Sequence, residues 1–141
     1  MNRYLGYAAI ITAVIISGCS SVNHTTLAGK WELATINGKA VEKSEEVPYI
    51  DIDNEIKSIG GYDGCNNLGG GITIGKQNEI TFSNVISTLR LCPEQGDNAM
   101  LGKVLESTRK YEISVAERDS IKSLSLFDGN GGNLATFTES N

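Results

Sequence analysis

The most reactive side chains of this 141-residue chain belong to three cysteines and one histidine. Histidine is the usual base for a Ser or Cys nucleophile, but His24 lies in a polar segment where we expect it to be solvated. No histidine follows it, and no G-x-S-x-G motif occurs. The sequence therefore predicts no catalytic centre, although two of the 17 acidic side chains could still meet as a carboxylate pair in the folded chain.

Two short patterns resemble a phosphate-binding and a calcium-binding loop, but each lacks a residue that such a loop needs. Residues 70–76 have the G-x-x-x-x-G-K spacing of a phosphate loop, but Gln77 stands where Ser or Thr must hold the metal ion. Residues 51–55 alternate acids as a calcium loop does, but Ile56 stands where such a loop needs glycine. We therefore expect no metal and no cofactor.

Cys19 follows a short apolar segment typical of a secretory signal peptide. Arg3 precedes an uncharged run that is shorter than the roughly 20 residues of a membrane-spanning helix. The run ends in Ile-Ser-Gly before Cys19, which resembles the bacterial lipobox, where the thiol receives a diacylglycerol and a peptidase cuts before the cysteine. We expect residues 1–18 to be a cleaved signal peptide and Cys19 to be the lipidated N-terminus. The alternatives are an ordinary signal peptide or an uncleaved anchor.

Residues 19–26 then form a polar tether between the lipid and the folded part. Ser20 is not the Asp that retains lipoproteins of enteric bacteria in the inner membrane, so we expect an outer-membrane anchor facing the periplasm. Cleavage removes one charge, Arg3, and changes the net charge from −5 to −6. Such an acidic chain is a poor nucleic-acid binder, and its membrane contact should run through the lipid. The oligomeric state is not encoded in these features.

Cys65 and Cys92 remain once Cys19 is assigned to lipid. In the periplasm two such thiols are more often bonded than free. A bond would close a loop of 28 residues and stabilise the fold by about 3.5 kcal/mol in the chain-entropy model. Free buried thiols are an alternative. A redox couple is a weaker one, because redox pairs usually occur as Cys-x-x-Cys at a helix start.

The elements that must position these cysteines are short strands separated by Gly, Asn and Asp turns. The predicted strands are residues 31–36, 49–53, 55–59, 72–74, 80–82, 111–115, 121–127 and 134–137. Asn37-Gly38 is a strong turn signal, because both residues tolerate positive φ. Residues 69–71 are three glycines and are expected to be a local flexible point.

One segment changes to a helical period. Intervals of three and four residues place on one face Met100, Leu101, Val104, Leu105 and Thr108. This predicts a helix near residues 93–110, whose apolar face must cover part of the sheet. The expected fold is mainly β (α+β): one domain, residues 27–141, with a small curled or barrel-like antiparallel sheet and one helix covering an end or face.

Three ordered segments resemble the META domain family. Residues 27–38 match its L-x-G-x-W-x-L…I-N-G opening, residues 64–70 match G-C-N-x-x-x-G, and residues 88–92 match T-x-x-x-C before the helix. The resemblance covers residues 27–137. It implies a one-domain, mainly β fold with a helix, anchored in the cell envelope and associated with stress responses, as in the HslJ-type heat-inducible lipoproteins of bacteria. It carries no catalytic residues.

The motif residues fit structural roles. We expect unusual backbone angles at Gly64 and Gly70, a side-chain to backbone bond in a turn at Asn66, and core packing by Trp31. Thr88 opens the third motif segment.

Three functions follow as hypotheses. The first is a non-enzymatic envelope lipoprotein that binds or stabilises an envelope protein or ligand under stress. The second is a small lipoprotein inhibitor of an envelope hydrolase, with Leu89-Arg90-Leu91 as its exposed loop. The third is an enzyme that uses surface carboxylates. An inhibitor should present a rigid protruding loop, whereas a ligand-binding module should show an apolar groove or patch.

Overall fold

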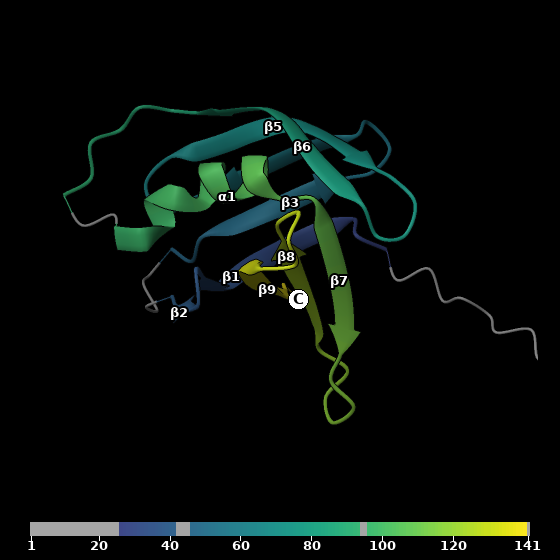
Figure 1. Cartoon of the computed structure of the whole chain (residues 1–141). Coiled ribbons are helices and arrows are strands. Elements are labelled where there is room, and N and C mark those ends of the chain that lie inside the picture. Colours follow the sequence, from purple (N-terminus) through teal and green to yellow (C-terminus); the bar gives the residue numbers. More distant parts are fainter. Residues whose placement is uncertain (1–25, 42–45, 94–95, 141) are drawn as a thin grey trace, which may run out of the picture.

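The computed structural model describes residues 26–41, 46–93 and 96–140, and the described chain is mainly β. Antiparallel strands form one curled sheet with a short helix against it, which confirms the expected fold class (Figure 1). The strands are β1 (Gly29–Ile36), β2 (Lys39–Ala40), β3 (Tyr49–Asp53), β4 (Ser58–Tyr62), β5 (Asn67–Ile74), β6 (Ile80–Ser87), β7 (Lys110–Val115), β8 (Lys122–Phe127) and β9 (Asn133–Glu139). The predicted signal peptide, Cys19 and all of the tether but Thr26 lie outside the described residues.

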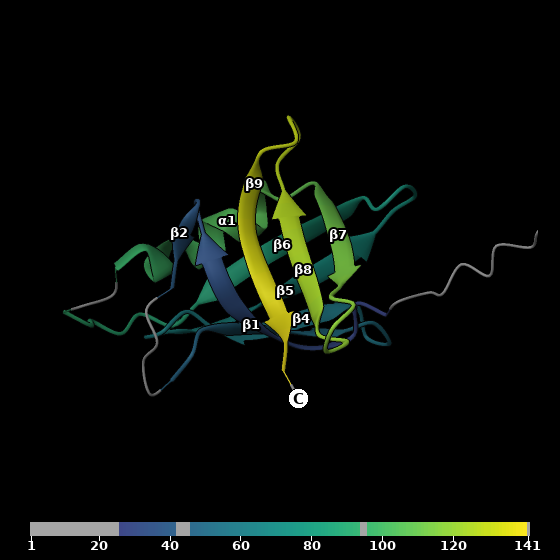
Figure 2. The ribbon, with the colours of Figure 1, turned by 90° about the horizontal axis from the view of Figure 1, so that it is seen from below.

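The sheet is an incomplete barrel. Its strand order is β6-β5-β4-β3-β1-β9-β8-β7, and β2 pairs only with β1. The two end strands meet where they begin, because the Ile80 N–H donates to the Arg109 carbonyl and the Tyr111 N–H to that of Asn78, both at 3.0 Å. Beyond that point β6 and β7 diverge, and the curvature of the sheet is plain in Figure 2.

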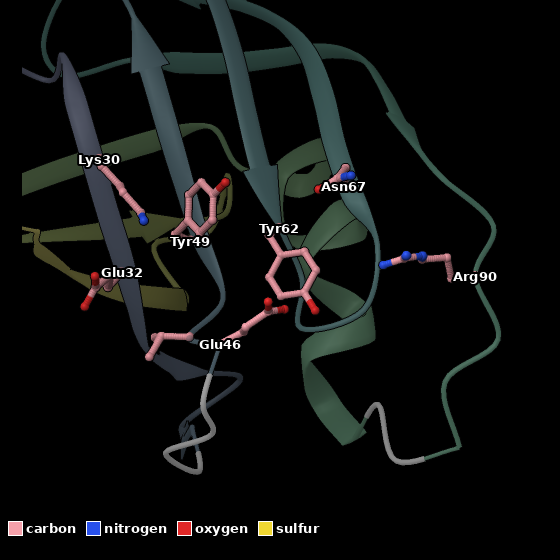
Figure 3. A pocket seen from close by; sticks show the side chains of 8 residues that line it. Lys30, Glu32, Glu46, Tyr49, Tyr62, Asn67 and Arg90 are labelled. Carbon is pink, nitrogen blue, oxygen red and sulfur yellow. The ribbon is translucent and has the colours of Figure 1, made fainter.

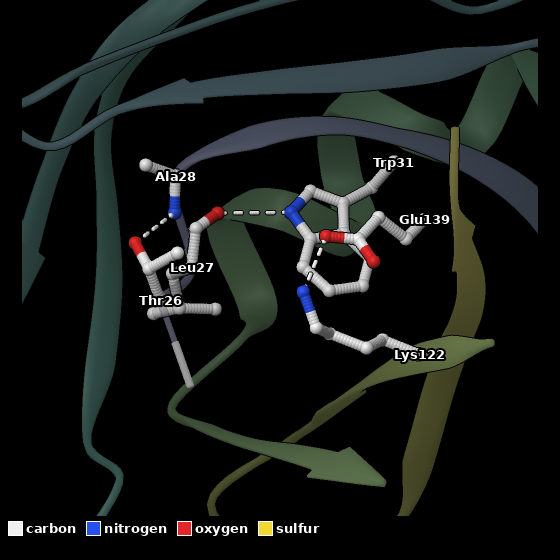
Figure 4. Close-up of polar contacts among 6 residues, drawn as sticks. All are labelled: Thr26, Leu27, Ala28, Trp31, Lys122 and Glu139. Atoms are coloured by element: carbon white, nitrogen blue, oxygen red, sulfur yellow. Dashed lines mark hydrogen bonds and ion pairs between the residues drawn. The ribbon is translucent and has the colours of Figure 1, made fainter. Parts of the chain in front are cut away.

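The core is built by the inward side chains of alternating strand positions. Trp31 is fully buried on β1, and its indole N–H donates to the Leu27 carbonyl at 2.9 Å (Figure 4). This bond satisfies the one polar group that the ring takes into the core. Nearby, Lys122 and Glu139 form an ion pair at 2.7 Å between β8 and β9.

The helix is shorter than the sequence predicts. A 3₁₀ turn, η1 (Gly96–Met100), precedes α1 (Leu101–Ser107), which packs against β6. The helix ends because Thr108 is extended, with ψ 137°, and its hydroxyl donates to the Val104 carbonyl at 2.7 Å. The prediction of a helix over residues 93–110 was therefore wrong in length. No helix in the described part of the chain is both long and apolar enough to cross a bilayer.

The glycine run at residues 69–71 is a strand and not the flexible point that the sequence indicates. It lies inside β5 and pairs with both β4 and β6, with a register shift between Gly69 and Gly71. The expectation of an unusual backbone angle at Gly70 was also wrong, because its φ is not positive. A Cβ at Gly70 would lie 3.0 Å from the Ser83 carbonyl oxygen on β6, so a larger residue there would require β6 to shift slightly.

The segment predicted as a strand over residues 55–59 is mainly a turn. The Asp53 carboxylate accepts the backbone N–H groups of Glu55 and Ile56 at 2.9 and 3.2 Å, which closes the turn. Strand β4 consequently begins only at Ser58 and continues to Tyr62.

Candidate functional site

Two motif segments meet at one end of the sheet, and the first of them is a tight turn over residues 63–66. The buried Asp63 carboxylate accepts the N–H groups of Cys65 and Asn66 at 2.9 and 2.6 Å. Gly64 has a φ of 97°, a left-handed conformation that favours glycine. The turn therefore fixes the positions of the Cys65 and Asn66 side chains.

The second segment is residues 88–92, here named the leucine loop, and three interactions hold it on the turn. The Asn66 side-chain oxygen accepts the Thr88 hydroxyl at 3.0 Å and the Arg90 N–H at 2.6 Å. Cys65 and Cys92 form a disulfide with their Cα atoms 6.1 Å apart, within the range that a bond requires.

Anchored and unanchored positions alternate along the leucine loop. Thr88, Arg90 and Cys92 make the anchoring contacts, whereas the side chains of Leu89 and Leu91 are 98% and 101% exposed. Both leucine side chains therefore lie in solvent. Ile86 on β6 is also strongly exposed.

A groove of about 520 Å³ lies on the other side of the leucine loop, on the outer face of the sheet. Its lining residues are Lys30, Glu32, Glu46, Val47, Tyr49, Tyr62, Asn67 and Arg90. Four of them are cross-strand neighbours, because Glu32 pairs with Tyr49, Tyr49 with Tyr62, and Tyr62 with Asn67. This row, here named the tyrosine row, runs perpendicular to β1, β3, β4 and β5 and leads toward Arg90 (Figure 3).

Charged side chains lie beside both tyrosines of the groove. The Lys30 ammonium lies 4.0 Å from the centre of the Tyr49 ring. A hydrogen bond to the Glu46 carboxylate raises the pKa of Tyr62 above its ordinary value, with burial and the negative charge of Glu46 adding to the rise. The Arg90 charge acts in the opposite direction on this pKa. The two tyrosine rings are 6.4 Å apart, and Figure 3 shows the Arg90 guanidinium directed toward Tyr62.

The structure brings most of the sequence motif together. Gly64, Asn66, Cys65, Cys92 and Thr88 all lie where the turn meets the leucine loop. The role expected for Asn66 needs correction, because its side chain bonds the distant leucine loop and Asp63 closes the turn itself. Trp31 lies apart, in the core. In the described ranges, no three His, Cys, Asp or Glu side chains are grouped as metal ligands.

Sequence reasoning missed the groove. Tyr49 begins the predicted strand at 49–53 and Tyr62 lies in no predicted strand, although both are aromatic residues on the outward side of strands whose other side is buried. Outward tyrosines at the ends of neighbouring strands are the signal that was available.

Comparison with known proteins relates the fold of this chain to solved structures. None of the curated proteins is a significant match to it. Among solved structures, a solution structure of a protein from Burkholderia xenovorans is 18% identical, with 80% of this chain and 82% of that chain covered and a TM-score of 0.61. A DUF4847 family protein from Bacteroides vulgatus is 13% identical, with coverage of 80% and 93% and a TM-score of 0.58. At these identities the likeness concerns the fold alone.

The META domain family matches residues 25–141, which include the turn, the leucine loop and the tyrosine row. That match spans most of the chain and contains the three motif segments in order. The chain therefore belongs to the META domain family.

Proposed function

We propose that this chain is a non-enzymatic lipoprotein of the bacterial cell envelope that binds a protein partner through the leucine loop. The observation that carries the proposal is the full exposure of Leu89 and Leu91 on a loop that Asn66 and the disulfide hold in place. The resemblance to heat-inducible envelope lipoproteins supports a role of this binding in the stress response.

Exposed leucines on an anchored segment favour docking. Burying one leucine side chain contributes roughly 1.5–3 kcal/mol, so two leucines entering a partner supply a substantial part of a binding energy. The anchors also lower the entropy that the loop loses on binding, since residues 88, 90 and 92 are already fixed. Both features are typical of a recognition loop.

The position of the leucine loop suits a partner in the periplasm. The described chain begins at Thr26, at the end of the molecule opposite the leucine loop, as both Figure 1 and Figure 2 show. A lipid on Cys19 would hold the Thr26 end near the outer membrane. The leucine loop, at the opposite end of the described chain, would then be accessible to soluble or wall-bound proteins.

The groove favours binding over proton transfer. The Tyr62 hydroxyl is bonded to Glu46 and its pKa is raised, so this phenol gives up its proton less readily than an ordinary tyrosine. The Glu32 carboxylate accepts the Ser140 hydroxyl at 2.8 Å. The Tyr62 oxygen and the Glu32 carboxylate can each still accept a further hydrogen bond from a ligand.

Inhibition of an envelope hydrolase is the second candidate, and the protruding loop favours it. The side chains that would enter a hydrolase cleft are Leu89 and Leu91, because Arg90 points into the groove (Figure 3). An apolar pair of this kind fits an enzyme with an apolar subsite.

Site-specific photocrosslinking in cells tests the proposal. A photoreactive residue at position 91 is expected to capture one discrete protein, and the same probe at the exposed Val115 of β7 is the matched control. The purified captured protein should bind the chain at least about tenfold more weakly when Leu89 is changed to Asp. Equal capture at both positions, or unchanged affinity of Leu89→Asp, contradicts the proposal. Loss of a hydrolase activity in the complex would identify the inhibitor.

A further inference from the structure

The tyrosine row forms a straight track across the sheet. Glu32, Tyr49, Tyr62 and Asn67 follow one another on the adjacent strands β1, β3, β4 and β5. Neighbouring strands lie about 4.8 Å apart, so three gaps span about 14 Å. An extended peptide advances about 3.3 Å per residue, and about four to five residues cover this track.

The two cations at the ends of the track differ in their contacts. At the β1 end, the Lys30 ammonium is engaged with the Tyr49 ring. At the other end, no hydrogen bond or ion pair joins the Arg90 guanidinium to another residue within the described ranges. Its planar donors are suited to two parallel bonds with a carboxylate, and the Asn67 carboxamide lies beside it (Figure 3).

The surfaces between these ends suit a peptide. Tyrosine rings supply wide contact area with little conformational entropy to lose, and their hydroxyls bond main-chain groups. The track also ends at the leucine loop, whose other side carries Leu89 and Leu91. One partner can therefore contact the leucines and the groove together.

We propose that the tyrosine row binds an extended segment of the protein partner, with a carboxylate of that segment held by Arg90. This inference rests on the proposed function, because it assigns the groove to the same partner as the leucine loop. The carboxylate is an acidic side chain or a free C-terminus, which share one chemistry.

Defined peptide pools test the inference on the full mature lipoprotein in detergent. Fluorescein-labelled five-residue pools have one fixed Glu or one fixed Gln, each made with a free or an amidated C-terminus. Pools with a carboxylate should bind at least about tenfold more tightly than the Gln pool with an amidated end. The two carboxylate sources are read separately from the Glu-amide and Gln-acid pools.

Arg90→Gln should abolish this preference, so that acid and amide pools bind equally. The matched control is Arg118→Gln, which removes the same charge from the β7–β8 turn and should leave the ratio unchanged. Because Asn66 holds the backbone of Arg90, the disulfide and the thermal stability should survive the substitution. A carboxylate preference that persists in Arg90→Gln, an absence of any preference in the wild type, or tighter binding of a galacturonate trimer than of any peptide pool overturns the inference.

Different results would contradict the leucine loop proposal and the groove proposal. Leu89→Asp should weaken capture of the partner while leaving the acid-to-amide ratio of the peptide pools intact, because Leu89 lies outside the groove. Capture at position 91 without a carboxylate preference removes only the groove assignment. A carboxylate preference without capture at position 91 removes the docking role of the leucine loop.

Discussion

The side-chain oxygen of Asn66 accepts the backbone N–H of Arg90 at 2.6 Å, across 24 residues of sequence. The same oxygen accepts the Thr88 hydroxyl, so one buried amide holds both ends of the segment that carries Leu89. This bond couples the two faces of the candidate site, because Arg90 lines the groove while its neighbours are exposed.

Replacing Asn66 with Ala should release the leucine loop. The change removes the acceptor of two hydrogen bonds at a buried position, and we expect the free energy of unfolding to fall by about 1–3 kcal/mol. Urea denaturation measures the loss, and hydrogen exchange should show faster exchange at the Arg90 amide. Asn67→Ala is the control, because its side chain is exposed and its backbone bonds to Thr88 remain. Equal stability of the two variants contradicts the role given to Asn66.

Removing the disulfide should cost more than removing Asn66. The double change Cys65→Ala and Cys92→Ala opens a loop of 28 residues, and the chain-entropy model gives a loss of about 3.5 kcal/mol. Trypsin should then cleave after Arg90 faster than in the wild type. Reductant should reproduce both effects in the wild type and add nothing to the double variant. Full alkylation of both thiols without reductant would show that the bond does not form.

Two adjacent glycines of β4 should respond differently to alanine. A Cβ at Gly61 would lie 2.6 Å from the Tyr49 carbonyl oxygen, so the strands must shift, and we expect a loss of about 1–3 kcal/mol. A Cβ at Gly60 meets no atom within 4 Å, so Gly60→Ala should be close to neutral. Thermal unfolding of the two variants provides the comparison. A neutral Gly61→Ala would contradict the close approach of β3 and β4.

Much of the fold could be predicted because its local signals agree with its strands. Asn37 and Gly38 have positive φ in the β1–β2 turn that their types predict, and residues 49–53 form the predicted strand. The errors arose where long-range pairing outweighed local preference. The glycines at 69–71 lack side chains that favour a strand, and only pairing with β4 and β6 holds them extended.

The candidate site was less predictable for the same reason. The pairing of Cys65 with Cys92 could be expected from cysteine number and compartment alone. The tyrosine row depends on the register of four strands, and a slip of one residue would turn Tyr62 to the other face. Sequence patterns do not specify such a register, nor the contact between Asn66 and the leucine loop.

The proposed lipid anchor predicts that changing Cys19 to Ala removes the protein from the membrane fraction. Without a thiol the diacylglycerol has no attachment point and the lipoprotein peptidase has no substrate. The variant should therefore stay uncleaved or appear in the soluble periplasmic fraction. Detergent-free fractionation and mass spectrometry of the N-terminus measure this outcome. A wild-type protein that is water-soluble and begins at another residue contradicts the lipid anchor.

Tyr62 should titrate above the ordinary range of a phenol, and Glu46 should be the main cause of this raised pKa. Because the Glu46 hydrogen bond and charge favour the neutral phenol, Glu46→Gln should lower the pKa of Tyr62 toward 10.0, whereas Arg90→Gln should raise it further. The difference in absorbance at alkaline pH between the wild type and Tyr62→Phe isolates this titration.

The raised pKa of Tyr62 also predicts how the stability of the folded state changes with pH. In the unfolded chain Tyr62 loses its proton near pH 10, while in the folded chain it still holds the proton at that pH. The contribution of Tyr62 to stability is therefore fully present below pH 10 and is lost as the pH rises through the folded pKa. Urea midpoints across this window should fall more steeply for the wild type than for Glu46→Gln. Parallel curves would show that the Glu46 contact does not stabilise the folded state.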